Sequence, residues 1–249
     1  MSVQILDIYS GNRINFAQEK ATGTDGILLK GGQGEWPDIL RVHPEWIPQI
    51  ETLNIPWGIF WQMDARFSAE KHKAAIKKLY PDGNFGKLGL WLAVELPYYP
   101  MPDWMYWRLP FAGYKLIEST WRGVFSYTNK YPEIYTSTSK WNLIARSCPL
   151  ALQKEFAAKS RLWIAQYKVE KPDKLGAWED HWTFWQYTEN PDYSVYRGTE
   201  TEFNAEFKLN ITIPTPSTLE PNPIRVSPPT SDYIKALDDS IAAIQKLRT

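Results

Sequence analysis

The sequence predicts an α/β fold in which one domain is a barrel of strands. Short apolar runs typical of strands alternate with amphipathic stretches typical of helices, a pattern that favours parallel strands. The number of these runs suits a barrel, and 249 residues can bury a core of that size. The apolar run at 91–94 ends in Glu95. A carboxylate at the end of a buried strand is costly unless it has a partner or a chemical task.

The strands and helices follow from composition and spacing. Strands are predicted at residues 3–9, 26–30, 56–62, 88–96, 124–128, 134–136, 162–166 and 182–187. Helices are predicted at 68–80, 113–121 and 149–159. In the first of these, Ser68 can cap the amino end, and His72, Ile76 and Leu79 follow roughly helical spacing.

The composition changes near the carboxyl end of the chain. We expect the barrel to occupy residues 1–212, because residues 213–230 are rich in proline, serine and threonine and predict an extended linker. Residues 231–249 predict an amphipathic helix with a narrow apolar stripe. This helix either docks back on the barrel or serves in self-association or in binding a partner.

Charge, cysteine and histidine content exclude several classes of function. Lysine plus arginine and aspartate plus glutamate both number 28, which argues against binding of nucleic acid or of an anionic membrane surface. The single cysteine and three histidines lack metal-ligand spacing, so we expect neither a metal nor a cofactor. No membrane span and no signal peptide are predicted. The chain is therefore expected to be made in the cytoplasm and to reach a cell wall by lysis or non-classical export.

Aromatic residues are abundant, with 13 Trp, 14 Tyr and 10 Phe. Many lie among polar residues, where rings can stack on the apolar faces of sugars. Five near predicted strand ends are candidates for binding a polysaccharide: Trp61, Trp91, Tyr135, Trp163 and Trp185. Each of them taken singly could equally fill the core.

An ordered series of segments resembles glycoside hydrolase family 25, the lysozymes or N-acetylmuramidases. The segments lie at 5–9, 14–16, 26–34, 58–61, 92–95, 133–141, 162–167, 182–188 and 202–207, so the resemblance covers about residues 3–207. It implies a distorted TIM-like β/α barrel with some helices missing and a cleft at the carboxyl ends of the strands. It also implies hydrolysis of β-1,4 bonds in peptidoglycan or a related amino-sugar polymer.

The family's residues carry over only in part. Glu95 matches the second acid of the Asp-x-Glu signature, but Ala93 replaces the first; Gln33 replaces a glutamate on the second strand, where we expect it to contact substrate. Glu202 stands in place of the closing aspartate.

Glycoside hydrolysis usually needs two carboxyl groups, or one together with the substrate's acetamido group. We expect Glu95 to be the general acid and Asp7 its partner, with Asp64 as a further candidate. Asp7 could instead cap a turn, and Asp64 could pair with Arg66. Because Ala93 lacks an acid, the chain is either a working glycosidase or a glycan-binding module that grips without cutting.

Overall fold

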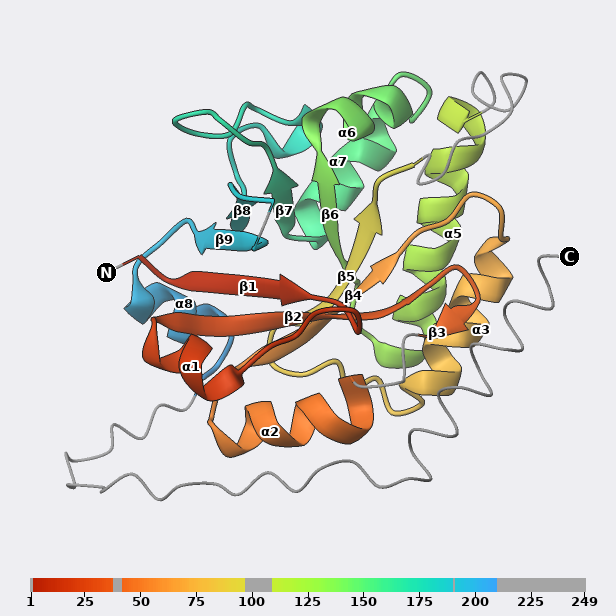
Figure 1. The fold of residues 1–249 in the computed structure, drawn as a ribbon. Coiled ribbons are helices and arrows are strands. Elements are labelled where there is room, and N and C mark those ends of the chain that lie inside the picture. The colour runs from red at the N-terminus through yellow and green to blue at the C-terminus, as the bar shows by residue number, and fades with distance from the viewer. Residues whose placement is uncertain (1, 38–41, 97–108, 190, 210–249) are drawn as a thin grey trace, which may run out of the picture. The chain divides into compact units, whose positions relative to one another are not determined.

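The computed structural model describes residues 2–37, 42–96, 109–189 and 191–209 (Figure 1). The chain divides into a compact unit, Met1–Ile211, and a second unit, Thr212–Thr249. The predicted linker at 213–230 and the predicted helix at 231–249 lie outside the described residues and stay predictions.

Eight strands close into a barrel in the order β1-β2-β4-β5-β6-β7-β8-β9, with β9 paired back to β1. They are β1 (Gln4–Ile8), β2 (Thr24–Gln33), β4 (Trp57–Gln62), β5 (Gly89–Val94), β6 (Glu133–Ser137), β7 (Leu162–Ala165), β8 (Phe184–Gln186) and β9 (Tyr193–Tyr196). All neighbours are parallel except β9, which runs antiparallel to β8 and to β1. The short strand β3 (Trp36–Pro37) forms a hairpin with the end of β2.

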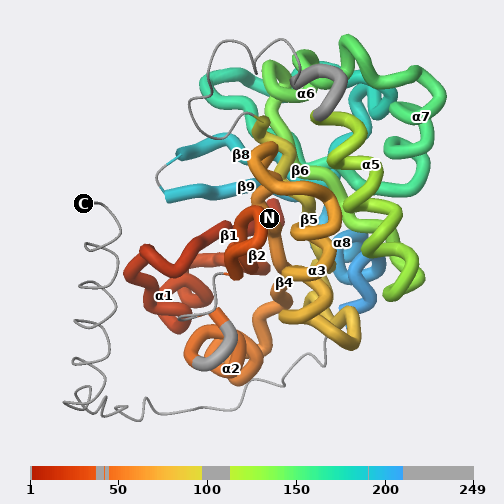
Figure 2. Tube along the Cα trace, turned by 90° about the vertical axis from the view of Figure 1, so that its right-hand side faces the viewer, coloured from red at the N-terminus to blue at the C-terminus, as the bar shows by residue number. Residues whose placement is uncertain are grey.

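Helices surround this barrel unevenly (Figure 2). They are α1 (Phe16–Ala21), α2 (Ile47–Thr52), α3 (Ala69–Leu79), α5 (Leu109–Thr128), α6 (Thr138–Ala145), α7 (Leu150–Lys159) and α8 (Glu200–Glu206). Within the described residues, β7 and β8 are joined by a 3-10 turn (Gly176–Trp178) rather than an α-helix. The fold is thus a distorted TIM-like barrel with some helices missing, as the family resemblance implies. None of the described helices combines the length and apolar character needed to cross a bilayer.

Seven of the eight predicted strands coincide with observed strands, but the one at 124–128 is wrong. These residues form the last part of α5. Their β-branched and aromatic side chains favour a strand locally. However, Ile117, Trp121 and Val124 recur at helical spacing and are all buried, so tertiary packing decides for the helix.

The interior of the barrel is filled by large rings. Side chains of alternating strand residues point inward. The buried inner cluster includes Ile5, Leu28, Trp91, Ala93, Tyr135, Trp163, Ala165 and Phe184. Trp163 lies at the centre of the rings, 5.9 Å from Trp91 and 4.2 Å from Tyr135 between ring centroids. The interior of the barrel is therefore a packed core, and a binding or catalytic site is expected at one of its ends.

Helix α8 packs at the amino end of the barrel, beside the start of β1 in Figure 1. Phe203 and Phe207 belong to the inner cluster, and the Phe207 ring stacks on Phe184 at 5.6 Å. Glu202 accepts a hydrogen bond from the backbone N–H of Thr199 at 2.7 Å and completes a capping box. Glu202 is therefore a helix-capping residue at the end of the barrel opposite the predicted cleft.

Candidate active site

Glu95 lies just beyond the carboxyl end of β5, two residues after the inward-facing Ala93. The alternation of strand side chains points Glu95 toward the mouth of the barrel, and its side chain is half-buried rather than sealed. Burial raises the pKa of Glu95, while the Gln62 amide and the ammonium groups of Lys140 and Lys30 act in the opposite direction. A carboxyl group with a raised pKa keeps its proton to higher pH than usual, which suits a general acid.

Asp7 reaches the same mouth from the end of β1. Burial raises the pKa of Asp7 well above its usual range, and the charges of Asp192 and Glu95 raise it further. A hydrogen bond from Gln186 Nε2 to Asp7 Oδ2, 3.0 Å long, opposes this shift. Asp7 is thus close enough to Glu95 for the charge of Glu95 to act on it.

A third carboxylate, Asp192, joins them. The backbone N–H of Asp7 donates to the carbonyl of Asp192 at 3.1 Å, because β9 begins beside the end of β1. Burial, together with the charges of Glu189 and Glu95, raises the pKa of Asp192 to about 6. Asp192 could not be predicted from the sequence, because it follows Pro191 in a connection without apolar periodicity. It reaches the site because β9, the strand that follows it, pairs antiparallel with β1.

Gln186 organises the polar floor of this site. Its Oε1 accepts hydrogen bonds from the hydroxyls of Tyr135 at 2.6 Å and Tyr167 at 3.1 Å, while its Nε2 holds Asp7. Burial raises the pKa of both phenols, so they stay protonated donors. Gln186 and Tyr167 lie in segments that resemble family 25. Their side chains point inward because the residues two positions before them, Phe184 and Ala165, belong to the inner cluster.

Ala93 sits between Gln62 and Tyr135 in the strand register. Its side chain is fully buried. Gln62 Nε2 is also buried and makes no hydrogen bond to another described residue, although the amide is near enough to Glu95 to favour its carboxylate form.

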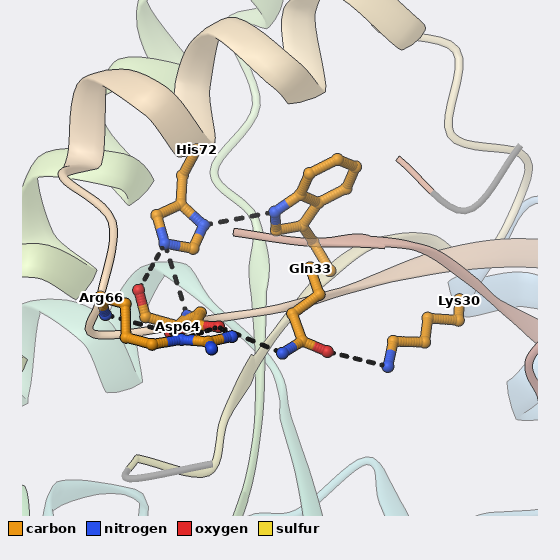
Figure 3. A network of polar contacts seen from close by, with 6 residues as sticks. Lys30, Gln33, Asp64, Arg66 and His72 are labelled. Carbon is orange, nitrogen blue, oxygen red and sulfur yellow. Dashed lines mark hydrogen bonds and ion pairs between the residues drawn. The ribbon is translucent and has the colours of Figure 1, made fainter. Parts of the chain in front are cut away.

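Asp64 belongs to a second polar network, at the ends of β2 and β4 (Figure 3). Arg66 Nε donates to Asp64 Oδ1 at 2.9 Å, and Gln33 Nε2 donates to Asp64 Oδ2 at 3.1 Å. Burial opposes the charge of Asp64, but the bonds from Arg66 and Gln33 outweigh it and lower the pKa. The geometry favours an ion-pair role for Asp64 over a catalytic one.

Gln33 is nearly buried in this same network. Besides donating to Asp64, it accepts a hydrogen bond from Lys30 Nζ at 3.3 Å. Its predicted contact with substrate stays a prediction, and its visible role is to connect Asp64 to Lys30, whose charge acts on Glu95.

Burial contradicts the predicted sugar contacts of three tryptophans, Trp61, Trp91 and Trp163, while that of the partly buried Trp185 stays a prediction. Trp61 is fully buried, belongs to the outer core and donates from Nε1 to His72. Trp91 and Trp163 are sealed inside the barrel below the acids. Trp185 lies between the inward-facing Phe184 and Gln186, so it faces outward and donates to the Gln166 carbonyl at 2.7 Å. An apolar run does not reveal which side chains of a strand point into the barrel. The packing of the large rings in the core determines these positions.

Of the five predicted rings, Tyr135 alone belongs to the acidic site, through Gln186 and the charge of Glu95. Among the described residues, the aromatic side chains most exposed at strand ends are different ones: Tyr9, Trp36 and Tyr187, after β1, β2 and β8. Within the described residues no three histidine, cysteine or acidic side chains are placed so that they could hold one metal ion together.

The raised pKa of Asp7 leads to a stability prediction. A carboxyl group whose pKa is higher in the folded than in the unfolded chain destabilises the fold at pH values above both, and this penalty disappears as pH falls below the unfolded value. Asp7→Asn keeps an acceptor for Gln186 and removes the charge. We expect it to raise the unfolding free energy at pH 7 by on the order of 1 kcal/mol, measured by urea denaturation.

The control is Asp82→Asn, an exposed aspartate that accepts a backbone hydrogen bond from Asn84. The gain in Asp7→Asn should shrink as pH falls through about 4, because below the unfolded pKa the wild-type carboxyl group is protonated in both states. Equal or lower stability of Asp7→Asn at pH 7 would show that the charge is compensated in the fold.

Comparison with known proteins supports the resemblance and the fold. The family model described as Glycosyl hydrolases family 25 matches residues 116–194, which confirms the resemblance over that segment. A family GH25 lysozyme from Aspergillus fumigatus superposes with a TM-score of 0.68 at 18% identity, covering 82% of this chain and 98% of that one. Among curated proteins no sequence match is found.

Two further structures agree. A muramidase from Acremonium alcalophilum gives a TM-score of 0.65 at 20% identity, covering 82% of this chain and 98% of its own. A bacterial lysozyme from Streptomyces coelicolor gives 0.63 at 20% identity, covering 82% and 96%. At these identities the likeness establishes the fold.

Proposed function

We propose that the chain is a lysozyme-like glycoside hydrolase that cleaves β-1,4 bonds in peptidoglycan or a related amino-sugar polymer. The observation that carries this proposal is Glu95: a half-buried carboxyl group with a raised pKa, at the carboxyl end of a barrel strand, within electrostatic reach of Asp7 and Asp192. Catalytic groups of such barrels lie at this end. The match to the family 25 model and the lysozyme-like fold support the same reaction class.

In this proposal Glu95 protonates the leaving oxygen of the glycosidic bond. The second group must be an anion that stabilises the positive charge at the sugar or orients the substrate's acetamido group. Asp192, with a pKa of about 6, is ionised at neutral pH and takes this role. Asp7 is the third carboxyl group of the site, and burial together with the charges of Asp192 and Glu95 raises its pKa.

The direct test adds purified protein to insoluble bacterial peptidoglycan and follows turbidity together with released reducing ends. We expect turbidity to fall and reducing ends to appear in proportion, because cleavage of the glycan strand produces both. A fall in turbidity without reducing ends would assign cleavage to the peptide stems and would contradict the proposal.

A second candidate is a glycan-binding protein that does not cut, and Ala93 is the observation that favours it. Loss of one catalytic group can lower a rate by several powers of ten while binding persists. This candidate predicts that the protein sediments with peptidoglycan and releases no product. If Ala93→Asp then produces reducing ends, the barrel is a disabled enzyme; if Ala93→Asp stays inactive, the missing acid is not what prevents cleavage.

A further inference from the structure

Trp36 is an exposed aromatic residue whose ring is held in place by its neighbours. It lies in β3, on the hairpin that follows the carboxyl end of β2, and 52% of its surface is exposed. Among the described residues, no other large aromatic side chain is exposed to a greater extent. A tryptophan with half its surface in water is available for contact with a ligand.

Glycine residues allow the hairpin to pack so closely. Gly34 adopts a left-handed φ of 60°, and the Phe67 ring occupies the space that a Cβ atom would need. A Cβ atom on Gly32 would likewise meet the Trp61 ring and the backbone carbonyl of Trp36. The glycine-rich segment at the end of β2 therefore seats Trp36 against the barrel, which explains a run that could otherwise indicate a phosphate loop.

Two neighbours fix the orientation of the Trp36 ring. The Phe67 ring meets it edge-on at 4.7 Å, and the Arg66 guanidinium lies 5.4 Å from its centroid. Arg66 is itself held by its ion pair with Asp64. A ring that is fixed before binding loses little conformational entropy when a ligand stacks on it.

The same contacts connect Trp36 to the acidic site. Figure 3 shows the polar chain that runs from Arg66 through Asp64 and Gln33 to Lys30, whose charge acts on Glu95. Trp36 thus lies on the β2 side of the barrel mouth. A polymer that crosses the mouth beside Glu95 would extend over this ring.

Charges around Trp36 cancel in pairs. Arg66 pairs with Asp64, and Lys71 pairs with Glu35 at 2.9 Å. The surface therefore offers an apolar ring face among compensated charges, which suits a neutral sugar better than a phosphate or a nucleic acid.

We propose that Trp36 forms a sugar-binding subsite in which its indole stacks on the apolar face of a neutral N-acetylhexosamine ring of the glycan, away from the bond that is cleaved. This inference rests on the proposed function for the identity of the polymer. Arg66 and Phe67 are positioning residues that hold the indole.

The test measures binding without cleavage. In the Glu95→Gln background, we compare Trp36→Ala, Trp36→Phe and a control, Leu150→Ala, which removes another exposed apolar side chain at the start of α7. The ligand is purified peptidoglycan in sedimentation assays, with N-acetylglucosamine tetramer as competitor. We expect the Kd of Trp36→Ala to rise about tenfold, as for loss of one aromatic anchor, Trp36→Phe to be intermediate and Leu150→Ala to match the parent.

The outcomes separate this inference from the proposed function. Unchanged binding by Trp36→Ala, no binding by the parent, or no competition by the tetramer overturns the subsite. Tenfold weaker binding of Trp36→Ala alongside a wild-type chain that releases no reducing ends supports the subsite and contradicts the hydrolase.

Discussion

Glu95→Gln should abolish most hydrolysis of peptidoglycan while leaving the fold intact. The amide has nearly the shape of the carboxyl group but cannot give a proton to the leaving oxygen. General acids contribute about 10²- to 10⁴-fold to a rate, so we expect a loss in that range. The measurement is the initial rate of reducing-end release at saturating peptidoglycan.

The stability of Glu95→Gln should respond differently from its rate of hydrolysis. Because burial raises the pKa of Glu95, its charge is costly in the folded chain, and the neutral amide should leave stability unchanged or higher at pH 7. Glu170→Gln, at an exposed position, is the matched control and should keep full activity. Glu95→Gln with the wild-type rate would remove Glu95 from the mechanism and leave Asp192 as the next acid to test.

The barrel could be predicted from the sequence because its strands are short apolar runs in an alternating order. Prediction failed where local preference and packing disagree, as at Val124 and Tyr127, which favour a strand but lie in α5. The strand β9 was missed since Tyr193–Tyr196 is short and follows Pro191 without an apolar run. Its antiparallel pairing with β1 is a long-range contact that no local pattern encodes.

The site could be predicted in part. Glu95 and Asp7 end strands that the sequence identifies, and parallel strands bring their carboxyl ends to one edge. Asp192 could not be found this way, because its place depends on β9. The tryptophans were misplaced for a different reason: a strand period of two gives two faces but does not say which one looks into the barrel, and Trp61 and Trp163 lie on opposite sides of the wall.

A second large effect, on the unfolding free energy, is expected from an ion pair at the amino end of the barrel. Glu133 begins β6 with a side chain that is only 12% exposed, and Arg161 pairs with it through Nε and Nη2, both 2.9 Å from Oε1. Arg161 also donates to Glu206 Oε1 at 3.2 Å and lies 4.3 Å from the Phe207 ring centroid. One guanidinium therefore ties β6 and β7 to α8.

Arg161→Ala should cost about 3–5 kcal/mol of unfolding free energy, since it leaves the Glu133 carboxylate buried without its cation. Urea denaturation at pH 7 measures this loss. Arg122→Ala is the control, because Arg122 also pairs with two glutamates, Glu118 and Glu155, but on an exposed helix surface. Such exposed pairs contribute about 1 kcal/mol or less.

Two further measurements identify the cause of the loss. Burial already raises the pKa of Glu133, and removing Arg161 removes the main influence that lowers it. Arg161→Ala should therefore recover stability as pH falls and Glu133 takes up a proton in the folded chain. Adding Glu133→Gln should recover part of the loss at pH 7, because no charge then remains to be buried. If Arg161→Ala costs no more than Arg122→Ala, the closure of the barrel by α8 depends on the rings of Phe203 and Phe207 rather than on this ion pair.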